Sequence, residues 1–244
     1  MFKYLFIILG YILSTNLAFA DGHEAAEVAV ADPAEISFVF NTLLFCIGGF
    51  LVMWMAAGFT MLEAGLVRGK NTVVICIKNL GLFSIAGLAY YLIGYNLMYA
   101  GVDGGYFGSI SIWSSGTDEL AGQDYSPASD WFFQMVFVAT TASIVSGALA
   151  ERILIYPFFA FILVLTAILY PISGSWQWGG GWLSEMGFSD FAGSTIVHSV
   201  GGWAALVGAL VLGARKGKFN DDGTANVMPG SSIPMATLGV WILW

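Results

Sequence analysis

The sequence contains little charge, and this scarcity indicates its broad class. Charged residues make up 10% of the 244 residues, whereas hydrophobic residues make up 58%. A soluble domain carries about 25% charged residues. The composition therefore predicts a polytopic membrane protein, and we expect an all-α bundle of membrane helices in contact with the lipid bilayer.

Basic residues, cysteines and histidines are also few. A net charge of -8 and the lack of a basic patch argue against nucleic-acid binding. Cys46 and Cys76 both lie in apolar runs, where nothing resembles a metal or redox pair. Only His198 lies in a long apolar span, which argues against a haem or quinone enzyme with paired axial ligands. We therefore expect no cofactor, no metal site and no enzymatic activity.

The first twenty residues have the pattern of a secretory signal. Residues 1–20 place one lysine before a short apolar run and end in Ala18-Phe19-Ala20, the A-x-A form of a cleavage site. We expect a signal peptide over 1–20, a flexible acidic segment over 21–35 outside the cytoplasm, and a transmembrane domain over 36–244. The alternative is that residues 1–20 form an uncleaved first span.

Several apolar runs are long enough to cross the membrane, which takes roughly 20 helical residues. A sixth run begins near Ile233, but its twelve residues to Trp244 would rise only about 18 Å as a helix. Because that is too short to span, we expect further spans beyond the sequence given. The five full-length spans are predicted at 36–62, 72–100, 131–150, 153–173 and 193–213.

The basic residues predict the orientation of these spans. They lie in alternate connections, and the other connections carry acidic residues alone. By the positive-inside rule the basic connections are cytoplasmic and the mature N-terminus is outside. We expect Lys78, two turns into the second span, to extend its side chain back to the cytoplasmic surface. The basic residues of the connections are Arg68, Lys70, Arg152, Arg215, Lys216 and Lys218.

An isolated acid and the membrane histidine stand eight residues apart. Asp190 follows a glycine-rich loop and is suited to cap the fifth span by accepting backbone N–H groups. His198 then lies about 12 Å further along that helix. An ionisable group at this depth normally faces a cavity or a partner. Two interpretations remain open: a neutral imidazole that lines a pore, or one satisfied by a carbonyl between packed helices.

Aromatic residues gather near the predicted outer ends of the spans. Phe133 and Phe137 are four residues apart and share a helix face, where they could close a pore mouth or pack in the core. Trp178 lies in a glycine-rich outer loop, where it is either a ligand-binding residue or a member of the interfacial aromatic belt.

Four short motifs resemble the ammonium transporter family, the Amt/Mep/Rh proteins. They are GLVRGKN (65–71), SGALAERI (146–153), WGGGWL (178–183) and DFAGSTIVH (190–198), and they occur in order over about 36–244. The resemblance implies an eleven-span fold of two inverted five-helix repeats and a last helix. This chain would supply the first five-helix repeat and the start of the sixth span.

The resemblance implies an outer recruitment site for ammonium or methylammonium. Trp178 and Phe133 match its aromatic residues, and Asp190 matches an acid that shapes the backbone of the site. Ala192 and Gly193 would place carbonyl groups nearby.

The resemblance also implies a gate and a pore. Phe137 matches one member of a stacked phenylalanine gate, and His198 matches the first of two facing pore histidines, with Thr195 in the same motif. By the same resemblance we expect transport of ammonium or ammonia, a homotrimer in the bacterial inner membrane and a PII-type signalling partner. A sensor of the same fold is the alternative.

Overall fold

The computed structural model describes residues 32–116 and 123–244, and within them it contains helices and no strand. The all-α membrane bundle expected from the sequence is thus confirmed for the described residues. The predicted signal peptide at 1–20, and the predicted flexible segment from 21 to 31, lie outside the described residues. Both remain predictions.

The helices follow the predicted apolar runs closely. Among the described residues, five segments are long and apolar enough to cross a membrane, and a shorter apolar helix, α10, has 11 residues. The spanning segments are Pro33–Leu66, Gly69–Tyr99, Pro127–Leu149, Ile155–Ser175 and Ser194–Leu212. Their helices are α2 (Pro33–Leu66), η1 (Gly69–Asn71), α3 (Thr72–Ala89), η2 (Tyr90–Gly94), α4 (Tyr95–Tyr99), α5 (Pro127–Leu149), α6 (Ile155–Val164), η3 (Leu165–Leu169), α7 (Tyr170–Ser175), η4 (Ser194–Ser199) and α9 (Val200–Leu212), with α8 (Trp182–Glu185) and α10 (Ile233–Leu243) outside them.

The start of α2 corrects one predicted boundary. Residues 33–35 were expected in the flexible segment, but the helix already begins at Pro33. Proline suits the first helical position because it has no N–H to leave unpaired. The Asp32 carboxylate accepts a hydrogen bond from the backbone N–H of Ala34 at 3.0 Å, and Glu35 adds a negative charge to the first turn.

Three of the spans contain a π-helical turn. In the second and fourth spans these turns are η2 and η3, which contact each other, and in the fifth span the turn is η4 at its start. A π-turn shifts the helix register by one residue and often marks a functional site. The turn η4 contains His198.

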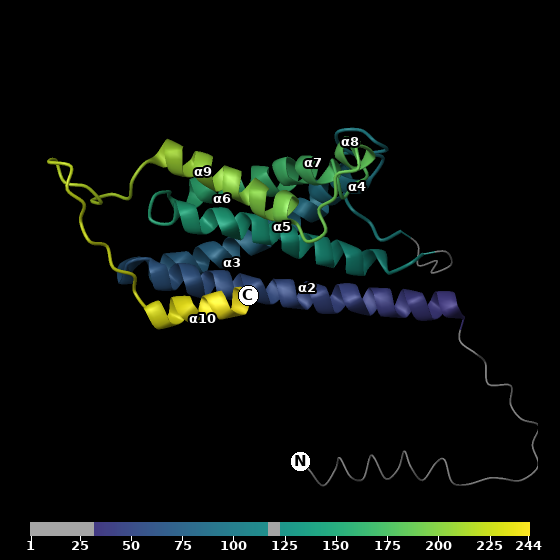
Figure 1. The fold of residues 1–244 in the computed structure, drawn as a ribbon, viewed down its shortest axis with the longest axis horizontal. Coiled ribbons are helices and arrows are strands. Elements are labelled where there is room, and N and C mark those ends of the chain that lie inside the picture. The colour runs from purple at the N-terminus through teal and green to yellow at the C-terminus, as the bar shows by residue number, and fades with distance from the viewer. Residues whose placement is uncertain (1–31, 117–122) are drawn as a thin grey trace, which may run out of the picture. The chain divides into compact units, whose positions relative to one another are not determined.

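Helix α5 lies at the centre of the compact unit formed by residues 37–244. It packs against α3 on one side and α9 on another, and the helices run alongside one another in Figure 1. The largest fully buried side chains, Tyr90, Tyr170 and Phe158, fill the space around it. Gly201 allows α9 to approach closely, because a Cβ there would lie 3.0 Å from the Thr141 carbonyl oxygen.

The short helix α10 packs against α2, as Figure 1 shows. Small residues allow this contact. A Cβ added to Gly65 would lie 2.6 Å from the backbone N of Ala236, and one added to Gly239 would lie 2.5 Å from the N of Leu62. Helix backbones in membranes approach closely where such residues face each other.

Lys78 does not extend to the surface, and the predicted snorkelling is wrong. Only 4% of the residue is exposed, and its Nζ lies 3.3 Å from Glu63 Oε2 on α2. Nζ also donates to the Ser146 carbonyl of α5 at 2.8 Å and lies 4.9 Å from the centre of the Phe158 ring. The nearby Glu63 carboxylate, which comes from another helix, explains why the ammonium group stays inside.

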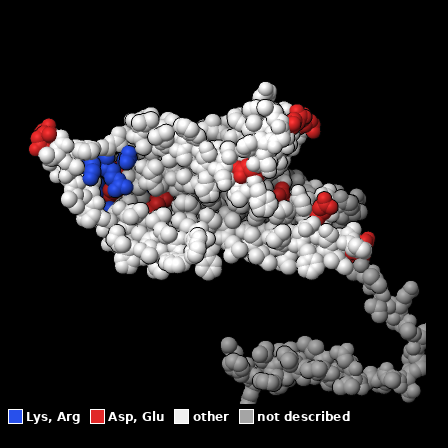
Figure 2. Space-filling view, in the orientation of Figure 1, with Lys and Arg blue, Asp and Glu red and all other residues white. Residues whose placement is uncertain are grey.

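The connections that carry the basic residues meet at one end of the bundle, which we call the basic end. It contains Arg68, Lys70, Arg152 and Arg215. Figure 2 shows the Lys and Arg atoms gathered there, whereas most of the acidic atoms lie towards the opposite end. The predicted grouping of these connections on one side is confirmed by the ion pairs that join them. Which side of the membrane that end faces remains a prediction.

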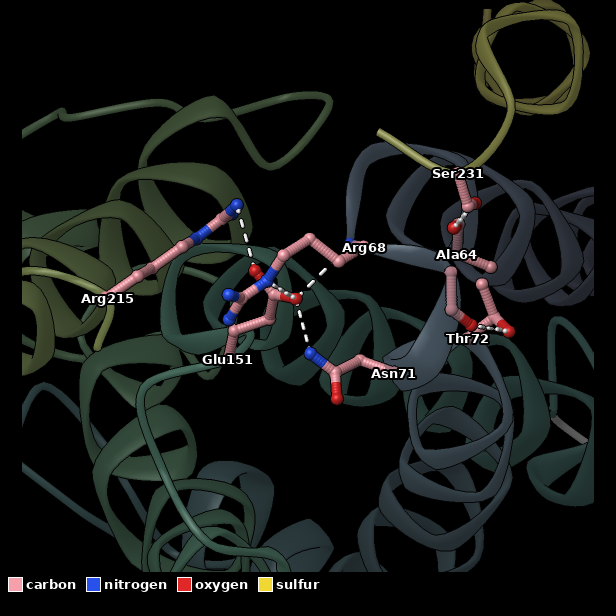
Figure 3. Close-up of polar contacts among 8 residues, drawn as sticks. Ala64, Arg68, Asn71, Thr72, Glu151, Arg215 and Ser231 are labelled. Carbon is pink, nitrogen blue, oxygen red and sulfur yellow. Dashed lines mark hydrogen bonds and ion pairs between the residues drawn. The ribbon is translucent and has the colours of Figure 1, made fainter. Parts of the chain in front are cut away.

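Glu151 links the connections at the basic end, as Figure 3 shows. Its Oε1 accepts from the backbone N and the Nε of Arg68 at 3.2 and 3.0 Å and from the Asn71 amide, and Arg215 lies 3.3 Å from Oε2. Burial alone would raise the pKa of the Glu151 carboxyl, but the hydrogen bonds from Asn71 and Arg68 hold it below its usual value.

Candidate functional site

A pocket of about 370 Å³ opens between α2, α4, the first turns of α5 and the segments that carry Trp178 and Phe191. We call it the aromatic pocket. It lies away from the basic end. Its lining residues are Phe45, Tyr95, Tyr99, Tyr125, Asp130, Phe133, Gln134, Phe137, Trp178, Phe191 and Ala192.

Three of the predicted aromatic residues meet in this pocket. The ring centres of Phe133 and Phe137 are 5.0 Å apart, and those of Phe137 and Trp178 are 6.0 Å apart, both in edge-to-face geometry. Phe45 of α2 extends the row, with its ring centre 5.1 Å from that of Phe133. A cation can bind to the faces of these rings, where the quadrupole is negative.

Asp190 begins the fifth span, as the sequence predicted. Its carboxylate accepts four backbone N–H groups, from residues 193 to 196, at 2.8 to 3.0 Å. Burial alone would raise the pKa of this carboxyl, but these hydrogen bonds, led by that from Ile196, hold it below its usual value. Gly193 has a φ of +87°, a conformation that favours glycine and lets the chain turn into η4.

Asp190 also positions the pocket tryptophan. Its backbone carbonyl accepts a hydrogen bond from Trp178 Nε1 at 2.6 Å. The same residue therefore fixes both the start of the fifth span and the orientation of the indole ring. Asp190 itself does not line the pocket, whereas Ala192 does.

His198 and Thr195 lie outside the aromatic pocket, on η4. Both residues are exposed on this chain. Thr141 of α5 ties η4 in place by donating to the Val197 carbonyl at 3.2 Å, one turn along α5 from Phe137. The backbone next to His198 therefore lies beside the turn of α5 that follows Phe137.

The surroundings of His198 support neither interpretation outright. Its Nδ1 lies 3.4 Å from the Gly193 carbonyl oxygen, a contact within its own span and not between packed helices. The residue is exposed, which leaves room beside it, and among residues 32–116 and 123–244 it is the only histidine. The pore role of His198 stays a prediction.

Seven of the eleven lining residues were not predicted from the sequence, and Asp130 is the only charged residue among them. Asp130 was read as one of several acids in the outer connections, but 92% of it is buried, and it lines the aromatic pocket. The Tyr95 hydroxyl hydrogen-bonds to its Oδ2. An acid in the first turn after Pro127, such as Asp130, is an ordinary signal of a helix start. Nothing in the sequence indicates that Asp130 contacts Tyr95, which lies in another span.

Fold and pocket together define a multi-pass membrane protein with a pocket lined by aromatic residues at one end of its bundle. The Ammonium Transporter Family matches residues 43–244. The chain belongs to the ammonium transporter family.

Individual relatives agree with this assignment. The chain is 40% identical over 249 residues to ammonium transporter Amt2 of Archaeoglobus fulgidus, covering 97% of this chain and 51% of the relative. It is 39% identical over 218 residues to ammonium transporter Amt2 of Haloferax mediterranei, covering 87% and 47% respectively.

Among solved structures, the one titled Sensor Amt Protein superposes with a TM-score of 0.80 at 38% identity, covering 86% of this chain and 53% of that one. The chain spans about half the length of the curated relatives it matches.

Proposed function

We propose that this chain forms the outer recruitment site and one wall of the conduction path in a protein that transports ammonium across a membrane. The convergence of Phe133, Phe137 and Trp178 on one pocket carries this proposal. Membership of the ammonium transporter family supports the substrate class.

Recruitment depends on replacing part of the hydration shell of NH4+. The Trp178 ring offers a cation–π contact that contributes about 0.5–2 kcal/mol, depending on how well the site excludes water. The carbonyl oxygen of Ala192, which lines the pocket, accepts an N–H group from the ion, whereas that of Gly193 is already bonded to the first turn of the fifth span. Sodium and potassium ions have no N–H groups to donate, so they gain less in the same site.

Beyond the Phe137 ring the conduction path becomes apolar, so the substrate crosses it as neutral NH3 and not as NH4+. Moving a small ion into such surroundings costs several kcal/mol even after relaxation. Ammonium therefore gives its proton to the pore histidine, which relays that proton, and NH3 continues along the path. The contact between His198 Nδ1 and the Gly193 carbonyl favours a proton on Nδ1, which leaves Nε2 free to accept a hydrogen bond.

An ammonium sensor of the same fold is the second candidate. The solved structure titled Sensor Amt Protein is similar to this chain with a TM-score of 0.80. A sensor would bind ammonium in the same aromatic pocket, but its rate of ammonium transport would be far lower than this binding predicts for a transporter. Flux and binding measured on one preparation separate the two functions.

The wider assembly is proposed on the family relationship. We place the protein in a bacterial inner membrane with its N-terminus outside and the basic end in the cytoplasm, following the distribution of Lys and Arg. A signal peptide over 1–20, a homotrimer and a PII-type partner at the cytoplasmic side complete the proposal.

Uptake of labelled methylammonium tests the transport function. The protein is expressed from its complete gene in cells that lack their own ammonium transporters. Trp178→Leu should lower uptake at low substrate by roughly 3- to 30-fold, in line with the loss of one desolvated cation–π contact. The matched control is Trp203→Leu, because Trp203 is an exposed tryptophan on α9 away from the aromatic pocket.

His198→Ala tests the pore. It should abolish most flux, or change the ratio of charge moved to methylammonium moved, while leaving ammonium binding at the aromatic pocket intact. Wild-type rate and selectivity in both Trp178→Leu and His198→Ala would contradict the transport mechanism.

A further inference from the structure

Asp130 is a buried carboxylate in the wall of the aromatic pocket. Only 8% of the residue is exposed, and the hydrogen-bonding groups at its carboxylate are the Tyr95 hydroxyl and the Gln134 side chain. Both are neutral. The carboxylate thus has hydrogen-bond donors but no opposite charge.

The missing charge is specific to this end of the molecule. Within residues 32–116 and 123–244, no Lys or Arg lines the pocket, and no salt bridge involves Asp130. Figure 2 shows the Lys and Arg atoms gathered at the basic end. A buried ionised carboxylate without a partner costs several kcal/mol. The helix dipole at the start of α5 offsets only a small part of this cost.

The pocket walls have the chemistry to hold the missing cation. Phe45, Tyr95, Tyr99 and Tyr125 line the pocket together with the carboxylate. Aromatic faces attract weakly hydrated organic cations and ammonium by their quadrupoles. A volume of about 370 Å³ exceeds that of one ammonium ion, so a methylated ammonium or a partly hydrated NH4+ also fits.

We propose that Asp130 is the counter-charge for an ammonium-type monocation in the aromatic pocket. The cation binds between this carboxylate and the tyrosine-rich wall and not on the Trp178 face alone. Asp130 thereby sets the affinity of the pocket. The inference rests on the proposed function, because it takes the aromatic pocket as the recruitment site for ammonium.

A purely structural role is the competing explanation. Asp130 lies in the first turn of α5, and its contact with Tyr95 ties α5 to α4. Removing its charge would then lower the amount of folded protein or its maximal rate but leave the apparent affinity unchanged. Apparent affinity is therefore the measurement that distinguishes the two roles.

The experiment compares two carboxylates that are six residues apart. Asp130→Asn keeps the shape of the side chain and removes its charge, and it should raise KM for methylammonium at least tenfold, as loss of a charge-assisted contact predicts. The maximal rate should stay within about twofold. Asp124→Asn is the control, because Asp124 is exposed in the preceding connection and lines no part of the pocket. It should change KM less than about twofold, since an exposed charge acts only by screened attraction.

The wall residues give a second test that does not depend on Asp130→Asn folding well. Phe45→Leu and Tyr125→Leu should each raise KM about three- to tenfold through loss of a cation–π contact. Phe50→Leu is their control, because Phe50 is exposed on the same helix as Phe45 and does not line the pocket. An unchanged KM in Asp130→Asn would overturn the inference. If Asp130→Asn does not yield folded protein, an unchanged KM in both wall variants would overturn it instead.

Failure of the inference differs from failure of the proposed function. The purified full-length protein is titrated with methylammonium, and with sodium for comparison, while tryptophan fluorescence is recorded. If the wild type showed no uptake and no binding, both the proposed function and the role of Asp130 would be overturned. Wild-type uptake with an unchanged KM in Asp130→Asn would overturn only the role of Asp130.

Discussion

The two ends of the bundle bury carboxylates in opposite ways. Towards the basic end, Glu63 pairs with Lys78, and Glu151 pairs with Arg68 and Arg215. At the aromatic pocket, Asp130 has only neutral donors. A buried charge that the chain itself neutralises fastens helices together. A buried charge that it leaves unneutralised, inside a pocket, is available for a ligand.

The largest effect should come from breaking the Glu63–Lys78 pair. Lys78→Met leaves Glu63 buried without its counter-charge, and removal of one partner of such a pair costs about 3–5 kcal/mol. Thermal unfolding in detergent measures the loss. Glu63→Gln combined with Lys78→Met should recover most of it, because no uncompensated charge remains. A single variant as stable as the wild type would show that the pair does not fasten α2 to α3.

Removal of the Asp190 carboxylate should have the next largest effect. Asp190→Ala leaves four backbone N–H groups without their acceptor and should lower stability by about 2 kcal/mol, in the upper range for helix caps. Asp190→Asn keeps one acceptor oxygen and should lose less. Uptake by Asp190→Ala should fall further than stability alone explains, because loss of the carboxylate frees the backbone at residue 190, whose carbonyl orients Trp178. Equal stability of the Ala and Asn variants would contradict this account.

The sequence was sufficient to predict the spans and the charge asymmetry. Membrane helices need about 20 apolar residues, so the predicted run 131–150 differs from the observed Pro127–Leu149 by only a few residues. The cap by Asp190 was also predictable, because the acceptor and its N–H donors are neighbours in sequence.

Contacts between distant residues could not be predicted in this way. Lys78 was assigned to the surface because its partner Glu63 lies on another helix, and Asp130 meets Tyr95 across 35 positions of sequence. The π-turn that holds His198 depends on the conformation of Gly193 and on the tie between Thr141 and Val197. Such features are set by packing, which residue spacing does not encode.

Acid should weaken the basic end through Glu151. Its pKa is lower in the folded chain than in the unfolded chain, so its stabilising contribution is complete above about pH 4.3 and is lost as the pH falls through the folded value. The wild type should exceed Glu151→Gln by about 1–2 kcal/mol near neutral pH. That difference should shrink below pH ~4.

Glu185→Gln, a substitution at an exposed residue away from the basic end, is the control in the same melting series. A difference that stays constant down to pH ~3 would contradict the assignment.

The smallest effect should come from Arg215, which shares Glu151 with Arg68. The Arg215 side chain is 26% exposed and makes a single 3.3 Å ion pair, whereas Arg68 adds hydrogen bonds from its backbone N and its Nε. Partly exposed pairs contribute about 0–1 kcal/mol and are screened by salt. Arg215→Gln should therefore shift the melting temperature slightly in dilute buffer and not at all at about 1 M salt, where the screening length is near 3 Å. Arg68→Gln should keep a measurable effect at both salt concentrations, because hydrogen bonds to a buried carboxylate are screened far less. If the two variants responded equally to salt, the two ion pairs of Glu151 would be equivalent. Arg68 could then not be the main residue that joins the connection after α2 to the connection after α5.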